Sequence, residues 1–115
     1  MDVFDLIDRL ETDLLKAGLD RYEQKEPVDR KNRESFLKVK QETEPIFQLI
    51  HLWEETVEKE IHRLPVFPNQ IKNTRDNMEL LLMHSYYKDV RKKRFMELYH
   101  SIRYVFNQIQ KCQLN

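Results

Sequence analysis

Residues 91–112 read RKKRFMELYHSIRYVFNQIQKC, and their apolar side chains recur every three or four positions. This spacing predicts an amphipathic α-helix with one apolar stripe and a face of charged and amide side chains opposite it. Other segments must cover the stripe, because a continuous apolar surface of this length is unfavourable in water. Its members are Phe95, Leu98, Tyr99, Ile102, Val105, Phe106, Ile109 and Cys112.

Apolar stripes with the same period predict three more helices. The first is expected over about residues 2–24, and the third over about residues 69–88. The main second helix is expected to begin at Thr43 as its N-cap, with Pro45 in a first turn that leaves N–H groups unpaired anyway. A short extra helix is expected before it, over about residues 33–42.

Particular residues within these stripes carry further predictions. Gly18 lies inside the first helix, which predicts that a neighbouring helix approaches closely there. Trp53 lies in the middle of the second stripe and is expected to anchor the core. The run Leu80-Leu81-Leu82-Met83 is apolar almost all the way round its helix. That helix is therefore either the most buried of the four or offers a second face to a partner.

These elements predict an all-α fold, an antiparallel up-down-up-down four-helix bundle with a short extra helix between helices 1 and 2. A chain of 115 residues is expected to form a single helical domain, 1–115, around one core. Residues 1–57 carry 9 basic and 14 acidic side chains, whereas residues 58–115 carry 11 and 6. This asymmetry is expected to set the acidic first helix beside the basic fourth.

The composition excludes several classes of function. Gly18 is the only glycine, so the chain cannot form a P-loop, a dinucleotide-binding loop, a nucleophile elbow or an EF-hand. No apolar run approaches the roughly 20 residues that span a bilayer. The acidic start differs from the basic start of a secretory signal, and Cys112 is the only cysteine. A cytoplasmic location without membrane contact is therefore expected.

Several short motifs extend over nearly the whole chain, most clearly over residues 70–109. They are Gln70-Ile71 through Asp76-Asn77, Glu79-Leu80, Ser85-Tyr86 and Lys92-Lys93-Arg94-Phe95, with Arg21-Tyr22 and Trp53 in the earlier helices. In these motifs the chain resembles the YppE-like family of uncharacterised Bacillus-type proteins. The resemblance implies a compact four-helix domain from a Gram-positive cytoplasm, and it implies no catalytic motif.

The ionisable residues do not predict a metal or catalytic site. Glu97 and His100 form one Glu-x-x-His motif, which di-iron bundles use in pairs, but both are expected to point away from the apolar stripe. His51, His62 and His84 also fall outside their stripes and are interpreted as surface residues. No metal or other cofactor is expected.

Glu60 is the one acid on the inward side of its helix. A buried carboxylate with a raised pKa would be a catalytic candidate. Its position near the helix end also allows the side chain to reach water or an arginine, and we favour this structural interpretation.

The remaining signal is a basic stretch between helices three and four, where Asp89 is expected to be the N-cap of helix four. Positive charge is unfavourable at a helix N-terminus by about 0.3–1 kcal/mol per residue. The stretch is either a solvated corner that meets Asp20, Glu23 and Glu26 of helix one, or a docking patch for an acidic protein or phosphate groups. The candidate protein-binding patch is Lys88, Arg91, Lys92, Lys93 and Arg94.

The expected function is therefore that of a non-catalytic protein-interaction module, either monomeric or weakly homo-oligomeric. Nucleic acid is the weaker candidate partner, because the net charge is zero and no groove-reading motif is present. The alternative is an enzyme or metal-binding bundle with a site between helices that the sequence does not reveal.

Overall fold

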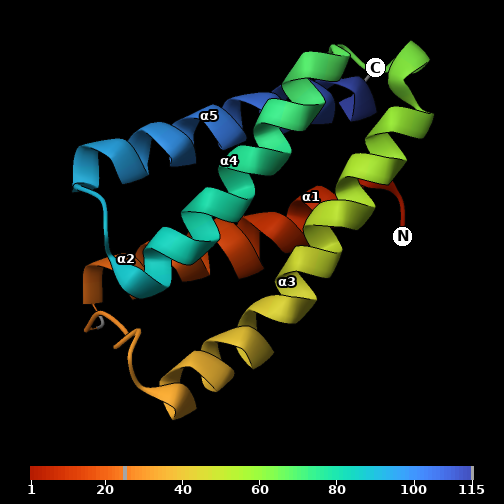
Figure 1. Ribbon diagram of the computed structural model, residues 1–115. Helices are drawn as coiled ribbons and strands as arrows, with labels where there is room; N and C mark the ends of the chain where they lie inside the picture. The colour runs from red at the N-terminus through yellow and green to blue at the C-terminus, as the bar shows by residue number, and fades with distance from the viewer. Residues whose placement is uncertain (25, 115) are drawn as a thin grey trace.

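The computed structural model describes residues 1–24 and 26–114, which form helices and no strand (Figure 1). The elements in chain order are α1 (Val3–Leu10), the π-helical turn η1 (Glu11–Lys16), α2 (Ala17–Gln24), α3 (Arg33–Lys59), the 3₁₀ turn η2 (Ile61–Arg63), α4 (Pro68–Tyr87), α5 (Lys92–Gln110) and the 3₁₀ turn η3 (Lys111–Leu114). The predicted all-α class is confirmed. No helix in the described part of the chain is long and apolar enough to cross a membrane.

The first helical stretch runs without interruption through α1, η1 and α2, close to the predicted range. Its first turn is held by a capping box, in which the Asp5 amide donates to Asp2 Oδ1 at 2.9 Å. The π-helical turn was not predicted. Its wider turn shifts the helix phase, and both Leu14 and Leu15 are buried within it.

The helix α3 corrects the prediction of two separate helices. It begins after Asn32, whose side chain accepts the Ser35 amide at 3.1 Å, and it continues through Pro45 without a break. Thr43 is therefore not an N-cap; it is buried, and its hydroxyl donates to the Lys40 carbonyl at 3.3 Å. Proline costs about 3 kcal/mol inside a helix, and the buried residues on both sides of Pro45 offset this cost.

The α4 helix packs against α2, α3 and α5, while α1 packs against α3. In Figure 1, α3 crosses α1, and α4 runs in the opposite direction across α5 and toward α2. Two contacts show that this first stretch and α5 are antiparallel neighbours. Tyr22 stacks on Phe95 with ring centroids 4.3 Å apart, and Gln110 Nε2 lies 3.5 Å from Asp8 Oδ1 near the other end.

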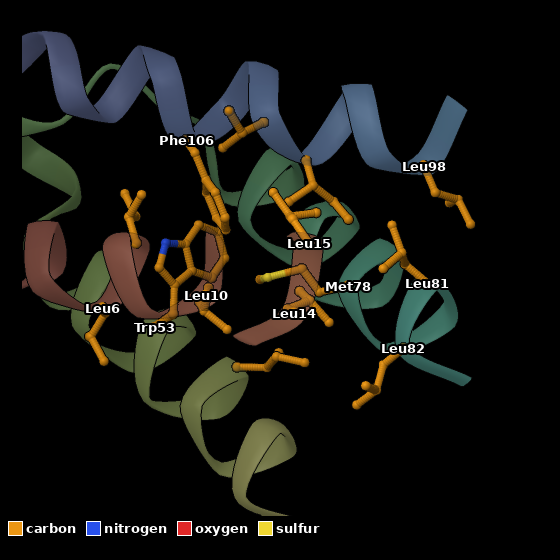
Figure 2. Close-up of a cluster of buried hydrophobic side chains, with 14 of the residues drawn as sticks. Leu6, Leu10, Leu14, Leu15, Trp53, Met78, Leu81, Leu82, Leu98 and Phe106 are labelled. Carbon is orange, nitrogen blue, oxygen red and sulfur yellow. The ribbon is translucent and has the colours of Figure 1, made fainter. Parts of the chain in front are cut away.

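Trp53 is fully buried, as predicted, and lies edge-on to Phe106 of α5 at 5.9 Å between ring centroids (Figure 2). The stripe predicted for α5 is also confirmed, since every member from Phe95 to Ile109 is buried and Cys112 is half-buried. The aromatic pair therefore joins α3 to α5 in the middle of the core.

The close approach predicted at Gly18 is confirmed. A Cβ atom added there would lie 3.1 Å from Leu81 Cδ2 and 3.8 Å from Ser85 Cβ. Because a contact of 3.1 Å is tighter than ordinary van der Waals packing, glycine allows α2 and α4 to approach this closely.

The apolar run in α4 is divided between core and surface. Leu81 and Leu82 are buried, whereas Leu80 is 42% exposed and Met83 is half-buried. One side of the run therefore packs in the core and the other side remains on the surface, and contact of that surface with a partner stays a prediction.

Candidate functional site

The basic corner is defined as Lys88, Arg91, Lys92, Lys93 and Arg94, at the turn from α4 to α5. Lys88 is the C-cap of α4 and adopts the left-handed conformation, with φ 50°, while its amide donates to the His84 carbonyl at 2.8 Å. A left-handed non-glycine residue is uncommon but is a known way to end a helix. Arg91 is the N-cap of α5 and makes no side-chain capping bond.

The prediction that Asp89 caps α5 is wrong. Its Oδ1 lies 2.6 Å from His84 Nδ1, and its Oδ2 pairs with Arg30 from the connection before α3. Burial alone would raise the pKa of Asp89, but the hydrogen bonds from His84 and Arg30 outweigh it, so the pKa is lowered. Asp89 is thus occupied by tertiary contacts and leaves the start of α5 without an acidic cap.

The corner's cations differ in whether they have an acidic partner. Lys92 Nζ lies 2.8 Å from Glu23 Oε1 of α2, and this hydrogen bond raises the Lys92 pKa. Arg94 forms a longer pair of 3.7 Å with Glu97 in its own helix. Within the described residues, neither Arg91 nor Lys93 has a carboxylate within 4.0 Å. Of the acids predicted to meet the corner, Glu23 alone does so in this part of the chain.

Most histidines lie on the surface as predicted. His51, His62 and His100 are exposed, whereas His84 is half-buried beside Asp89, which corrects its interpretation as a solvated residue. Among residues 1–24 and 26–114, no three His, Cys, Asp or Glu side chains are arranged to hold a metal ion.

Glu60 reaches an arginine, in agreement with the structural interpretation. Its Oε1 accepts from Arg63 at 2.7 Å, while Oε2 is buried without a hydrogen-bond partner. Glu60 and Arg63 lie at the turn after α3, so this pair stabilises the C-terminal end of that helix.

A cavity of about 390 Å³ lies between α2, the connection before α3, α3 and α4, and the sequence did not predict it. Arg21 lines it, donates to Ser85 Oγ at 2.8 Å and lies over the Tyr86 ring at 4.0 Å. Burial raises the Tyr86 pKa, in spite of the opposing effect of Arg21. The inward position of Arg21 in an otherwise apolar stripe was the signal that could have identified this site.

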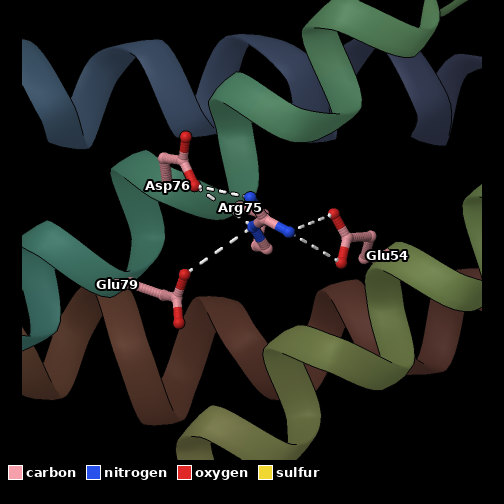
Figure 3. A network of polar contacts seen from close by, with 4 residues as sticks. All are labelled: Glu54, Arg75, Asp76 and Glu79. Atoms are coloured by element: carbon pink, nitrogen blue, oxygen red, sulfur yellow. Dashed lines mark hydrogen bonds and ion pairs between the residues drawn. The ribbon is translucent and has the colours of Figure 1, made fainter.

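A second polar cluster, also absent from the sequence predictions, joins α3 to α4 (Figure 3). Arg75 pairs with Glu54 at 3.0 Å, with Asp76 at 2.9 Å and with Glu79 at 3.7 Å. Beside it lies an open depression of about 500 Å³, lined by Phe47, Asp76, Glu79, Leu80 and Met83. The cluster therefore contributes two of its three carboxylates, Asp76 and Glu79, to the lining of this depression.

Comparison with known proteins supports the family resemblance and the fold. A family model described as a bacterial domain of unknown function (DUF1798) matches residues 8–112. The crystal structure of protein yppE from Bacillus subtilis is similar to this chain, with a TM-score of 0.77 and 22% sequence identity. The match covers 95% of this chain and 89% of that one. No curated protein matches the chain.

Several residues that carry the resemblance contact one another in the structure. Arg21 bonds to Ser85 and stacks on Tyr86, and Tyr22 stacks on Phe95. The Tyr22 hydroxyl also donates to the Val90 carbonyl at 2.6 Å. These contacts tie α2 to the end of α4 and to the start of α5, and so hold the basic corner in place.

Proposed function

The chain belongs to the bacterial DUF1798 family, a domain of unknown function, and we propose that it is a non-catalytic protein-interaction module. The proposed contact surface is the basic corner, and the proposed partner is an acidic protein. The cytoplasmic location expected from the sequence belongs to the same proposal.

The observation that carries the proposal is the exposure of Arg91 and Lys93 without an acidic partner in the described part of the chain. Both lie at the start of α5, where free N–H groups make positive charge unfavourable by about 0.3–1 kcal/mol per residue. The first turn of α5 contains no acid that would balance them. Helix stability therefore gives no reason for these two cations, which supports a role in contact with an acidic partner.

The same charges indicate how the contact would behave. Exposed cations speed association with an acidic surface and are screened within about 8 Å at physiological ionic strength. The affinity should therefore fall as salt is added. Lys92 contributes less than its neighbours, because Glu23 already neutralises it.

The experiment begins with affinity purification from a native lysate and identification of the retained proteins. A purified candidate partner is then titrated with wild-type protein and with the variant Arg91→Gln/Lys93→Gln. The matched control is Lys59→Gln/Lys72→Gln, which removes two exposed lysines elsewhere. We expect the corner variant to weaken binding about tenfold or more, and the control to leave it within about twofold. Equal affinities for all three proteins would overturn the proposal.

A second candidate function is binding of a small anionic ligand in the cavity beside Arg21, and the observation in its favour is the state of that arginine. Its guanidinium is half-buried, held by Ser85 and Tyr86, and has no carboxylate within 4.0 Å among the described residues. A fixed guanidinium matches a carboxylate or phosphate group, although Glu26, Asp29 and Glu42 also line the cavity and oppose an anion there. The test is titration with acetate and with inorganic phosphate while the NMR shifts of the Tyr86 ring are followed. We expect these shifts to change in wild-type protein and not in Arg21→Gln. Shift changes that persist in Arg21→Gln would contradict anion binding by this arginine.

A further inference from the structure

One face of α3 carries an exposed pattern of apolar and charged residues. Phe36 is 52% exposed, Lys40 and Glu44 are exposed, and Phe47 is half-buried. The spacings of four, four and three residues place these side chains in one row along the helix. We call this row the α3 stripe. It ends at the depression that Phe47 shares with Leu80 and Met83 of α4.

Both apolar and acidic side chains line the depression. Leu80 remains 42% exposed beside it, so the chain itself leaves this apolar surface uncovered. Asp76 and Glu79 line it, and Arg75 is the cation that pairs with both of them and with Glu54 (Figure 3). A complementary occupant would therefore present a large apolar side chain flanked by positive charge.

The α3 stripe of a second copy has these properties. Phe36 is a large exposed aromatic residue, and Arg33 and Lys40 are exposed cations about one turn away on either side of it. Within the described residues, neither Lys40 nor Glu44 has an ion-pair partner within 4.0 Å, so both charges are available to another molecule.

We propose that two copies of the chain associate through an antiparallel pair of α3 helices, in which Phe36 of each copy fills the depression of the other. A two-fold axis requires that contacting residues be placed symmetrically about one point. On α3, the point midway between Phe36 and Phe47 almost coincides with the point midway between Lys40 and Glu44. The two points differ by half a residue, about 0.75 Å along the helix. A single axis therefore sets Phe36 against Phe47 and Lys40 against Glu44, twice each.

This association uses a different surface from the basic corner, so its test is independent of the test of the proposed function. An aromatic side chain seated in a pocket and surrounded by charged residues is a common centre of binding energy in interfaces. The contact is small, and we expect a dimer with a dissociation constant in the micromolar range.

The test is analytical ultracentrifugation of the full chain and of charge-exchanged variants. Lys40→Glu alone and Glu44→Lys alone each set like charges against one another twice, and each should weaken the dimer about tenfold or more. A mixture of the two variants restores both attractive pairs across the interface, so it should form mixed dimers. The charges within each helix are the same in the mixture as in its components, so effects on folding cancel.

Phe36→Ala should also abolish the dimer, whereas Tyr104→Ala, which removes an aromatic residue of similar exposure from α5, should not. A wild-type chain that stays monomeric at about 1 mM would overturn the proposal and assign the depression to a different occupant. If the mixture of Lys40→Glu and Glu44→Lys forms no more dimer than either variant alone, the antiparallel geometry is wrong.

Discussion

Gly18 of α2 lies against Leu81 of α4 so closely that a Cβ atom on the glycine would come within 3.1 Å of Leu81 Cδ2. Two opposing effects act at this position. Any residue except proline would gain up to about 1 kcal/mol of helix propensity over glycine, but its side chain would also require the buried Leu81 to shift. The contact between α2 and α4 therefore limits the size of residue 18.

A large substitution at Gly18 should separate these effects. We expect Gly18→Leu to lower the free energy of unfolding by about 1–3 kcal/mol, because the added side chain overpacks the space between α2 and α4. The matched control is Ala17→Leu, at the half-buried neighbouring position. Urea denaturation of both variants checks this; a Gly18→Leu variant as stable as wild type would contradict the close packing.

Replacement of Trp53 should show how much the aromatic pair with Phe106 contributes. We expect Trp53→Ala to cost about 3–5 kcal/mol, because it leaves a large cavity beside Phe106. Trp53→Phe should cost clearly less, since it keeps most of the volume and removes an indole N–H that is buried without an acceptor. Equal denaturation midpoints for these two variants would show that the ring does not fill the core as described.

Replacement of Pro45 should stabilise α3. We expect Pro45→Ala to raise the free energy of unfolding by about 1–3 kcal/mol, because alanine restores a backbone N–H donor at an exposed position inside the helix. Thermal denaturation provides the measurement. A lower melting temperature would indicate that the helix depends on a proline bend at this point.

The charges around Asp89 predict a specific dependence on pH. The pKa of Asp89 is below its ordinary value of 3.8, since hydrogen bonds from His84 and Arg30 outweigh the effect of burial. A carboxyl whose pKa is lower in the folded state stabilises the fold above the unfolded pKa, and this stability is lost as pH falls through the folded pKa.

Between about pH 4 and pH 2, wild-type protein should therefore lose more stability than Asp89→Asn does. The difference should be at most about 1 kcal/mol, because the Asp89 side chain is 41% exposed. Denaturation midpoints measured across this range provide the check. Parallel pH profiles for the two proteins would contradict the role of this carboxylate.

Helical periodicity predicted the burial of α5 residue by residue, because its stripe packs along its length against other helices. It failed at Pro45, where local preference favoured a helix start and tertiary packing kept one continuous helix. It also missed the π-helical turn, whose phase shift depends on contacts of Leu14 and Leu15 with other helices.

Among the candidate sites, too, the sequence identified residues that are close together in the chain and missed contacts between separate elements. The residues of the basic corner are consecutive or nearly so, and sequence alone could identify them. The partners of Asp89, in contrast, come from α4 and from the connection before α3. The cluster around Arg75 likewise joins two helices. Such pairings depend on how the helices pack, and the pattern within one helix does not contain that information.

The free energy of unfolding of Arg91→Gln/Lys93→Gln tests most directly the claim that these cations serve binding rather than folding. The substitutions break no ion pair among the described residues and remove two positive charges from a helix N-terminus. We therefore predict a variant as stable as wild type, or more stable by up to about 1 kcal/mol per residue at low salt. A variant less stable than wild type, with a deficit that disappears as salt is added, would show that Arg91 and Lys93 stabilise the fold and would contradict the claim.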